Sequence, residues 1–301
     1  MTAAAYRCSA ESLALAEPMA GTASTVRSWL LLEHAGPWGM DAFVDARLPG
    51  GFGAELLGRC RAAGVRPLLI RRVGANASGG ACFVMRSGPE PPWIERTRLD
   101  EIERALELDL PALGRGERPG LEPWGEPLFL VCTHGRHDPC CAERGRPLAR
   151  ALAAGFRDGT WECSHIGGDR FAGNVVAFPH GMYFGRVGPE DAAGVVAAYA
   201  AGRIDLDHYR GRSCEPMPVQ AAEHALRVER GLDGVDDVAL ESSEPSGYEV
   251  SATFRVGRVG KERVVVRVVV GRSGPRLLTC RSSAEERPPA YRVLAIDAVG
   301  I

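Results

Sequence analysis

The chain has 301 residues, 45% of them apolar and 25% charged, which is the composition of an ordinary globular protein. At roughly 150 residues per domain, this length indicates about two domains. A formal net charge of −2 gives no electrostatic reason to expect wholesale binding of nucleic acid or of a membrane surface. The sequence contains no Walker A P-loop, no GxSxG nucleophile elbow and no HExxH zinc-protease helix, which argues against the enzyme classes that depend on them.

The start of the chain lacks the pattern of a secretory signal, because Arg7, Glu11 and Glu17 interrupt any apolar core. No stretch of about 18 apolar residues occurs that would span a bilayer. In an unsecreted protein, nine cysteines point to buried thiols, metal ligation or redox chemistry more than to a disulfide framework. We therefore expect a cytoplasmic protein.

Residues 1–110 are predicted to form an N-terminal α/β half, because short apolar strands alternate with helical patterns. Residues 111–127 are rich in proline and glycine and are predicted to be a connector between half-domains. The predicted strands of the N-terminal half are 29–33, 66–73 and 81–86, and its predicted helices are 54–63 and 97–108.

Residues 128–212 follow the order β-α-β-β-α, with cysteines at the end of the first strand, which resembles the thioredoxin-like layout. The predicted strands are 128–131, 160–163, 174–178 and 182–187, and the predicted helices are 140–154 and 189–201.

Residues 213–301 are predicted to form a small C-terminal α+β module in which we identify no chemistry. Its strand at 248–256 alternates apolar and polar side chains with period two, the pattern of a half-buried strand. The other predicted elements are a helix at 219–230 and strands at 263–270, 276–281 and 291–296.

The densest group of chemically active side chains lies in two motifs, FLVCTHGRHDPCCAERG and WECSHIGGDRFAGN. Within 34 residues they carry four cysteines and three histidines, a donor set that suits zinc or an iron–sulfur centre. Both motifs begin where a predicted strand ends, so their loops can converge at one edge of a sheet. Gly167 and Gly168 are candidate cofactor-binding residues, because glycine lets backbone N–H groups approach a cluster's sulfides.

These motifs resemble the sucrase/ferredoxin-like family, whose members contain a thioredoxin-like [2Fe-2S] ferredoxin domain. The resemblance covers residues from about 25 to 212. It implies a thioredoxin-like ferredoxin unit, preceded by an α/β half and followed by the α+β module.

The resemblance also implies four ligands for a [2Fe-2S] cluster, two of them cysteines that flank the first loop. Cys132 and Cys141 match the C-x8-C spacing of fungal members, and His165 takes the first position of their H-x3-H motif. The second position holds Asp169, which leaves two candidates for the fourth ligand. We favour Cys163 over Asp169, because a thiolate outcompetes a carboxylate for iron in a sulfide cluster.

The remaining cysteines and histidines have simpler interpretations. Cys140 is an alternate to Cys141 as the ligand at the helix start. His134 and His137 are expected to form hydrogen bonds within the loop. The other five cysteines are expected to be inert buried thiols: Cys8, Cys60, Cys82, Cys214 and Cys280.

Together these features predict an electron carrier rather than an enzyme, acting with a redox partner protein that the sequence does not identify. Two alternatives remain open. A thioredoxin-like thiol oxidoreductase would use Cys132 or the Cys140–Cys141 pair, but the chain has no C-x-x-C motif. A structural zinc module would accept the same donors, but the tight C-x2–4-C knuckles that zinc sites favour are absent.

Overall fold

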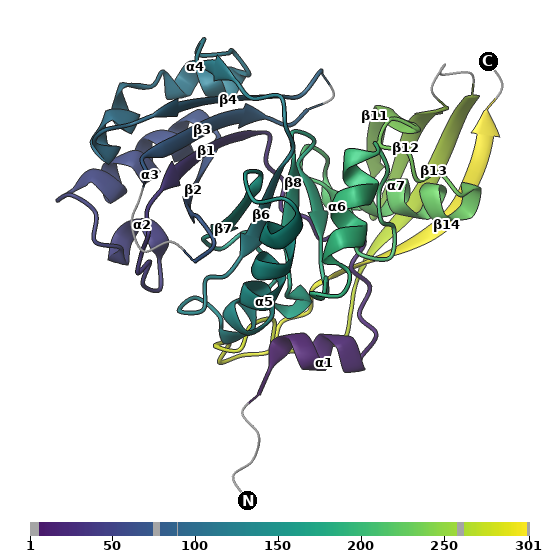
Figure 1. The fold of residues 1–301 in the computed structure, drawn as a ribbon. Coiled ribbons are helices and arrows are strands. Elements are labelled where there is room, and N and C mark those ends of the chain that lie inside the picture. Colours follow the sequence, from purple (N-terminus) through teal and green to yellow (C-terminus); the bar gives the residue numbers. More distant parts are fainter. Residues whose placement is uncertain (1–5, 75–78, 89, 258–261, 300–301) are drawn as a thin grey trace, which may run out of the picture.

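The computed structural model of the chain describes residues 6–74, 79–88, 90–257 and 262–299 (Figure 1). Its strands form a ten-stranded sheet of order β10-β9-β8-β6-β7-β2-β1-β3-β4-β5 and a four-stranded sheet of order β11-β12-β13-β14. The α/β fold expected from the sequence is confirmed. The strands of the large sheet are β1 (Ser28–Glu33), β2 (Val65–Arg71), β3 (Ala81–Arg86), β4 (Trp93–Arg98), β5 (Glu122–Pro123), β6 (Leu128–Cys132), β7 (Thr160–Cys163), β8 (Val175–Phe178), β9 (Met182–Phe184) and β10 (Tyr209–Arg212).

The large sheet is rolled, so that strands far apart in its order touch across its inner face. The rings of Trp29 in β1 and Phe178 in β8 lie 5.1 Å apart, centroid to centroid. These strands are four positions apart in the sheet, which in a flat sheet would separate them by about 19 Å. The inner face therefore encloses its own core, in which Phe83 and Trp161 also meet edge to face.

Helices cover the outer face of this sheet, as the alternation of side chains along each strand requires. Leu30 and Leu32 of β1 point outward to pack with α3 and α4, whereas Trp29 and Leu31 belong to the inner core. Phe129 in β6 likewise packs outward with α5 and α6. The helices concerned are α2 (Ala42–Asp45), α3 (Phe52–Ala63), α4 (Leu110–Arg115), α5 (Pro139–Gly155) and α6 (Ala192–Ala200), with the short 3₁₀ helices η1 (Ile102–Glu107) and η2 (Asp169–Phe171).

The N-terminal half and the cysteine-bearing half share this one sheet, joined where β2 pairs with β7. The antiparallel ladder there matches Ile70 with Cys163 and Arg71 with Glu162. Arg71 also donates to the Glu162 carboxylate at 2.6 Å. The end of β7, from which the second motif continues, is therefore held firmly against the first half of the chain.

The second sheet is covered on one face by α7 (Met217–Arg230), whose Val219 and Leu226 pack on its inward side chains. In β12, Ala252, Phe254 and Val256 are buried, which confirms the period-two pattern. The strands of this sheet are β11 (Val238–Ser246), β12 (Glu249–Val256), β13 (Glu262–Arg272) and β14 (Pro289–Val299).

The N-terminal helix and a loop of the C-terminal module meet at the start of α5. The helix α1 (Cys8–Ala14) packs against η2, and the segment between β13 and β14 passes beside both (Figure 1). Glu17 links them, because its carboxylate pairs with Arg170 at 2.9 Å and with Arg276 at 3.4 Å. Among the described residues, no helix is long and apolar enough to cross a membrane.

Several predicted elements are wrong. The helix predicted at 97–108 is instead the end of β4 followed by η1, because residues 93–98 pair with β3 along their whole length. The connector at 111–127 contains most of α4 and all of β5. The strand predicted at 276–281 is a loop with one isolated bridge, between Arg276 and Glu286. The elements α1, β10 and β11 were not predicted.

Candidate metal centre

The parallel strands β6 and β7 bring the two motifs to one edge of the sheet. Their register sets Cys132, the last residue of β6, opposite Cys163, the last residue of β7. Both cysteines face the inner core. Below them, the Thr133 hydroxyl donates to Glu162 at 2.8 Å, so the first loop is fastened to β7 as it leaves the sheet.

The helix α5 carries the second pair of cysteines toward this edge. Asp138 caps its first turn by accepting a hydrogen bond from the Cys140 backbone N–H at 2.8 Å. The helix lies unusually close to β6, because a Cβ on Gly145 would come well under 3.0 Å from the Cys132 carbonyl oxygen. Glycine at this position lets the first turn of α5 place Cys141 against Cys132.

Three ligand atoms converge at the sheet edge, from Cys132, Cys141 and His165, all within 4.8 Å of one another. Asp169 adds a fourth donor beside them. Its Oδ1 lies 3.1 Å from the Cys141 Sγ and 3.0 Å from the His165 Nδ1. The two thiols are only 1% exposed, and the Asp169 carboxylate is 3% exposed.

The protonation state of each of these groups depends on its neighbours in the site. A hydrogen bond from the Cys141 thiol holds the pKa of Cys132 well below its usual range, although burial opposes this. The same hydrogen bond raises the pKa of Cys141. Burial disfavours the charged form of His165, but its contacts with Asp169 and Cys132 outweigh burial and raise its pKa to about 9. The site thus favours a Cys132 thiolate beside a Cys141 thiol, an imidazolium and a carboxylate. A metal bound by all four groups would displace two protons, one from Cys141 and one from His165.

The two other cysteines of the motifs lie outside this group. Cys163 is fully buried in the inner core, where burial and the nearby Cys132 raise its pKa, and its Sγ is not within 4.8 Å of all three converging atoms. Asp169, the alternate from the sequence, occupies the position beside Cys141 and His165. Cys140, the alternate to Cys141, points to a different group of side chains.

The histidines form the exposed rim of the site. His165 is 27% exposed and His137 is 35% exposed, and their rings stack with centroids 3.8 Å apart. His134 is buried and fastens the loop as expected, because its ring nitrogens contact the Gly39 carbonyl at 2.9 Å and accept from the His165 backbone N–H at 3.3 Å.

The loop with Gly167 and Gly168 is held from behind by a buried arginine that the sequence analysis did not single out. Arg210 donates to the Gly167 carbonyl at 3.2 Å and to the Asn174 side chain at 2.7 Å, and Asn174 donates to the Gly168 carbonyl at 2.8 Å. Both glycines have positive φ, at +96° and +81°. Burial lowers the pKa of Arg210 to about 10, so this guanidinium remains a buried positive charge at neutral pH.

The donor set fits a metal centre that takes thiolates and imidazole. Two buried thiols and a carboxylate surround a buried ring nitrogen, the Nδ1 of His165, so four donors of the kinds that ligate metals face one another. Softer thiolates with imidazole suit zinc or an iron–sulfur cluster better than hard cations such as magnesium.

The sequence profile of the sucrase/ferredoxin-like family matches residues 19–211, so the chain belongs to this family. The match includes both motifs, the rolled sheet from β1 to β10 except its last residue, and Arg210. The resemblance stated from the sequence is thereby confirmed at the level of the family.

Among curated proteins, the chain is similar to the proteins named "Altered inheritance of mitochondria protein 32" of three yeasts. Identity is 36% over 133 residues for Meyerozyma guilliermondii, covering 40% of this chain and 46% of that protein. For Debaryomyces hansenii it is 35% over 98 residues, covering 29% and 36%, and for Clavispora lusitaniae 37% over 110 residues, covering 32% and 40%. The chain thus spans less than half the length of these relatives.

Among solved structures, the chain is similar to a thioredoxin-like [2Fe-2S] ferredoxin from Aquifex aeolicus. Identity is 20%, the TM-score is 0.28, and the match covers 31% of this chain and 97% of that one. A variant of the same ferredoxin matches with 21% identity and a TM-score of 0.26, over 28% of this chain and 97% of that one. These values describe a distant likeness over less than a third of the chain.

Proposed function

We propose that this protein is an electron carrier that holds a [2Fe-2S] cluster between Cys132, Cys141, His165 and Asp169. The observation that carries the proposal is the convergence of the first three ligand atoms within 4.8 Å at one sheet edge. When bound, such a cluster accepts and returns one electron at a time. Asp169 replaces the Cys163 favoured from the sequence, because its carboxylate is in contact with two of the three other donors.

The surroundings favour a higher reduction potential than four thiolates would give. A neutral imidazole in place of a thiolate removes negative charge from a cluster, as in Rieske centres. The buried Arg210 guanidinium adds a positive charge behind the glycine loop. Both effects stabilise the reduced, more negative state of the cluster.

A redox partner protein would dock where the site reaches the surface. The stacked rings of His165 and His137 are partly exposed there, and the His137 Nδ1 lies 3.4 Å from the carbonyl of Met40, whose side chain is 48% exposed. Arg136, in the same loop, is exposed. This surface fits a partner with an acidic rim. We propose neither nucleic acid nor a membrane surface as its partner, because a formal net charge of −2 gives no electrostatic attraction to either.

Iron and acid-labile sulfide measurements on anaerobically purified protein test the proposal. We expect two irons and two sulfides per chain, and visible absorption that bleaches with dithionite. Cys132→Ser should lose the iron, whereas the matched control Cys82→Ser should keep it, because Cys82 is a buried core thiol whose pKa burial alone raises to about 12. A protein that holds no iron, and that cannot be reconstituted with it, would refute the assignment.

A second pair of variants identifies the fourth ligand. We expect Asp169→Asn to change the EPR g values of the reduced protein or to lower its iron content severalfold. Cys163→Ser should leave both unchanged, because Cys163 packs in the inner core. The opposite pattern would restore Cys163 as the ligand.

One observation favours a second candidate, a thiol oxidoreductase. The neighbouring Cys141 thiol, whose Sγ lies within 4.8 Å, holds the pKa of Cys132 well below its usual range, which is the arrangement of a nucleophilic thiol beside a resolving one. Against it, both thiols are only 1% exposed, so a protein disulfide cannot reach them without rearrangement. Metal-free protein with rapid Cys132–Cys141 disulfide turnover would favour this candidate.

A further inference from the structure

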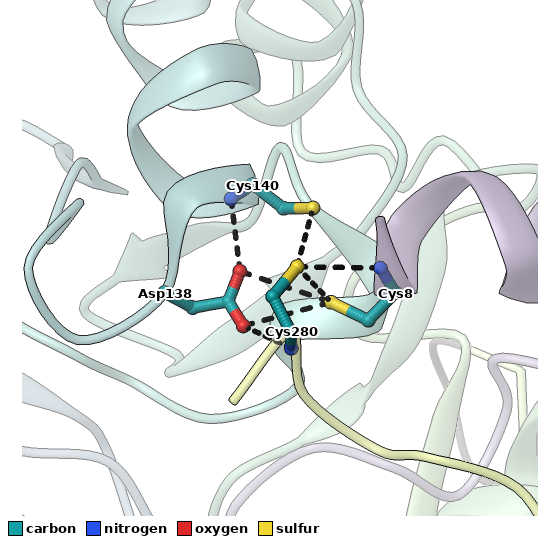
Figure 2. Close-up of side chains that lie close together, drawn as sticks. All are labelled: Cys8, Asp138, Cys140 and Cys280. Atoms are coloured by element: carbon teal, nitrogen blue, oxygen red, sulfur yellow. Dashed lines mark hydrogen bonds between the residues drawn. The ribbon is translucent and has the colours of Figure 1, made fainter. Parts of the chain in front are cut away.

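A second group of metal-ligating side chains lies at the start of α5, outside the centre described above. It consists of Cys8, Asp138, Cys140 and Cys280, whose ligand atoms all lie within 4.8 Å of one another. Figure 2 shows the three sulfur atoms and the carboxylate turned toward one another. They come from α1, from the first turn of α5 and from the segment between β13 and β14, so the group closes only in the folded chain.

The distances within this group are close to those of a tetrahedral zinc site. The Cys280 Sγ lies 3.4 Å from the Cys140 Sγ and 3.5 Å from the Cys8 Sγ. The two Asp138 oxygens lie 3.8 and 3.7 Å from the Cys8 Sγ. With Zn–S bonds of about 2.3 Å, the edge between two ligands of a tetrahedron is about 3.8 Å, and an edge from sulfur to oxygen is slightly shorter.

We propose that Cys8, Cys140, Cys280 and Asp138 bind one zinc ion, which fastens α1 and the segment between β13 and β14 to the start of α5. Three thiolates and one carboxylate provide the four donors of a closed, structural site. Binding deprotonates the thiols, so their protons are released to solvent. A carboxylate among the donors favours Zn²⁺ over Cu⁺, which prefers sulfur alone. This proposal does not depend on the iron–sulfur assignment.

The backbone around the group is arranged to stabilise negative charge. Asp138 accepts from the Cys140 and Cys280 backbone N–H groups, at 2.8 and 2.7 Å, and the Cys280 Sγ accepts from the Cys8 backbone N–H at 3.3 Å. The site also lies at the N-terminal end of α5, a helix of 17 residues. Three thiolates and a carboxylate carry four negative charges against the two positive charges of zinc. The backbone N–H groups and the N-terminal end of the helix offset part of this excess negative charge.

A disulfide accounts for the group less well than a metal ion. Cys280 lies between the thiols of Cys8 and Cys140, so a disulfide to either one leaves the other thiol unpaired. A disulfide also does not explain why the Asp138 carboxylate lies beside these sulfur atoms. Three free thiols packed with a carboxylate in one partly buried group are explained together by a single cation. The vicinal pair Cys140–Cys141 would then serve two centres, one residue for each.

Elemental analysis and zinc K-edge X-ray absorption of the full chain, purified anaerobically from zinc-containing medium, test this site. We expect one zinc per chain, with three sulfur neighbours and one oxygen neighbour. The Cys132→Ser variant should keep this zinc even where it loses iron, which separates the two proposals. Less than one zinc per ten chains, with the three thiols reactive or two of them joined in a disulfide, would overturn the proposal.

Two variants test individual ligands, and a third serves as the control. Cys280→Ser and Asp138→Asn should each weaken zinc binding at least tenfold in competition with a chromophoric chelator. Asparagine can still cap α5 at the Cys140 N–H but loses the acceptor for the Cys280 N–H, so circular dichroism of this variant is compared with that of the wild type before its zinc affinity is interpreted. The control Cys214→Ser, at a buried thiol outside this group, should bind zinc as the wild type does. Equal affinity in all three variants would contradict the site.

Hydrogen exchange provides a readout that does not depend on mutation. Removing zinc with a chelator should increase exchange at least tenfold in α1 and in residues 276–286, since the ion links these segments. The Tyr6–Leu277 hydrogen bond of 2.9 Å and the Glu17–Arg276 ion pair of 3.4 Å also connect these parts of the chain and do not involve the ion. Unchanged exchange in both segments after zinc removal would show that no ion fastens them.

Discussion

The close approach of α5 to β6 predicts opposite effects for two glycine-to-alanine changes in the same helix. In a helix interior, alanine is more favourable than glycine by about 1 kcal/mol. Gly155 is the last residue of α5, and there the new methyl group would meet nothing within 4 Å, so Gly155→Ala should gain part of this amount. At Gly145 it would meet the Cys132 carbonyl oxygen well under 3.0 Å, where ordinary contact needs at least 3.4 Å.

The magnitude at Gly145 follows from this overlap. The helix or the strand must yield by more than 1 Å to restore ordinary contact, and overpacking of this kind typically costs about 1–3 kcal/mol. The gain in helix propensity of about 1 kcal/mol offsets part of this cost, so Gly145→Ala should lower the free energy of unfolding by up to about 2 kcal/mol. The two variants should therefore differ by up to about 3 kcal/mol, with Gly145→Ala the less stable.

Urea unfolding of both variants and of the wild type, followed by circular dichroism, measures the difference. Iron content provides a second readout, because moving the first turn of α5 displaces Cys141 from Cys132 and should lower the iron bound per chain. If Gly145→Ala were as stable as Gly155→Ala, the close helix–strand contact that places Cys141 would be refuted.

Three further predictions concern the stability of the fold. Burial raises the pKa of Glu215 to about 8, so between about pH 4.5 and 8 the folded protein holds a proton that the unfolded chain has lost. The free energy of unfolding should therefore fall as pH rises, by at most about 1.4 kcal/mol per pH unit. Glu215→Gln should remove this slope in unfolding measurements at pH 5–8, and the same slope in the variant and the wild type would contradict the prediction. Trp29→Ala should cost about 3–5 kcal/mol in urea unfolding, because Trp29 is fully buried inside the rolled sheet, and a loss below 1 kcal/mol would count against the rolling. Gly168→Ala should cost about 1–2 kcal/mol, because φ is +81° and the methyl group would meet Arg210; a neutral result would show that the loop relaxes freely.

The parts of the fold that the sequence predicted are those with a strong local pattern. The alternation in β12 is one, because a single buried face sets its period of two. The apolar run that becomes β6 is another, because that strand is buried on both faces. The prediction that both motifs meet at one sheet edge also follows from local pattern, since each begins at the end of a strand. The structure places Cys132 opposite Cys163 there.

The errors arise where distant partners override local preference. The spacing of Leu99, Ile102 and Leu106 suits a helix, but residues 93–98 extend because β3 offers them a complete ladder. In the connector, a helix signal was present and was missed. Asp109 caps α4, Pro111 stands in its first turn, and Gly116 ends it with positive φ.

The second cysteine group was beyond prediction from sequence. Cys8 and Cys280 are 272 positions apart, and neither belongs to a ligand motif that would mark it as more than a buried thiol. Only the folded chain brings them to Cys140. The role of Arg210 could not be predicted for the same reason, because Arg210 lies 36 residues after its hydrogen-bond partner Asn174. Cys60 and Cys82, by contrast, are isolated core thiols as expected, and burial raises the pKa of each to about 12.

Pulsed EPR of the dithionite-reduced protein, grown with ¹⁵N-labelled histidine, shows whether a histidine ligates an iron–sulfur cluster. We expect an iron–sulfur signal coupled to a histidine nitrogen, with the coupling lost and the signal kept in His165→Cys. A reduced protein without an iron–sulfur signal, or with a signal that shows no histidine coupling, would contradict the proposal.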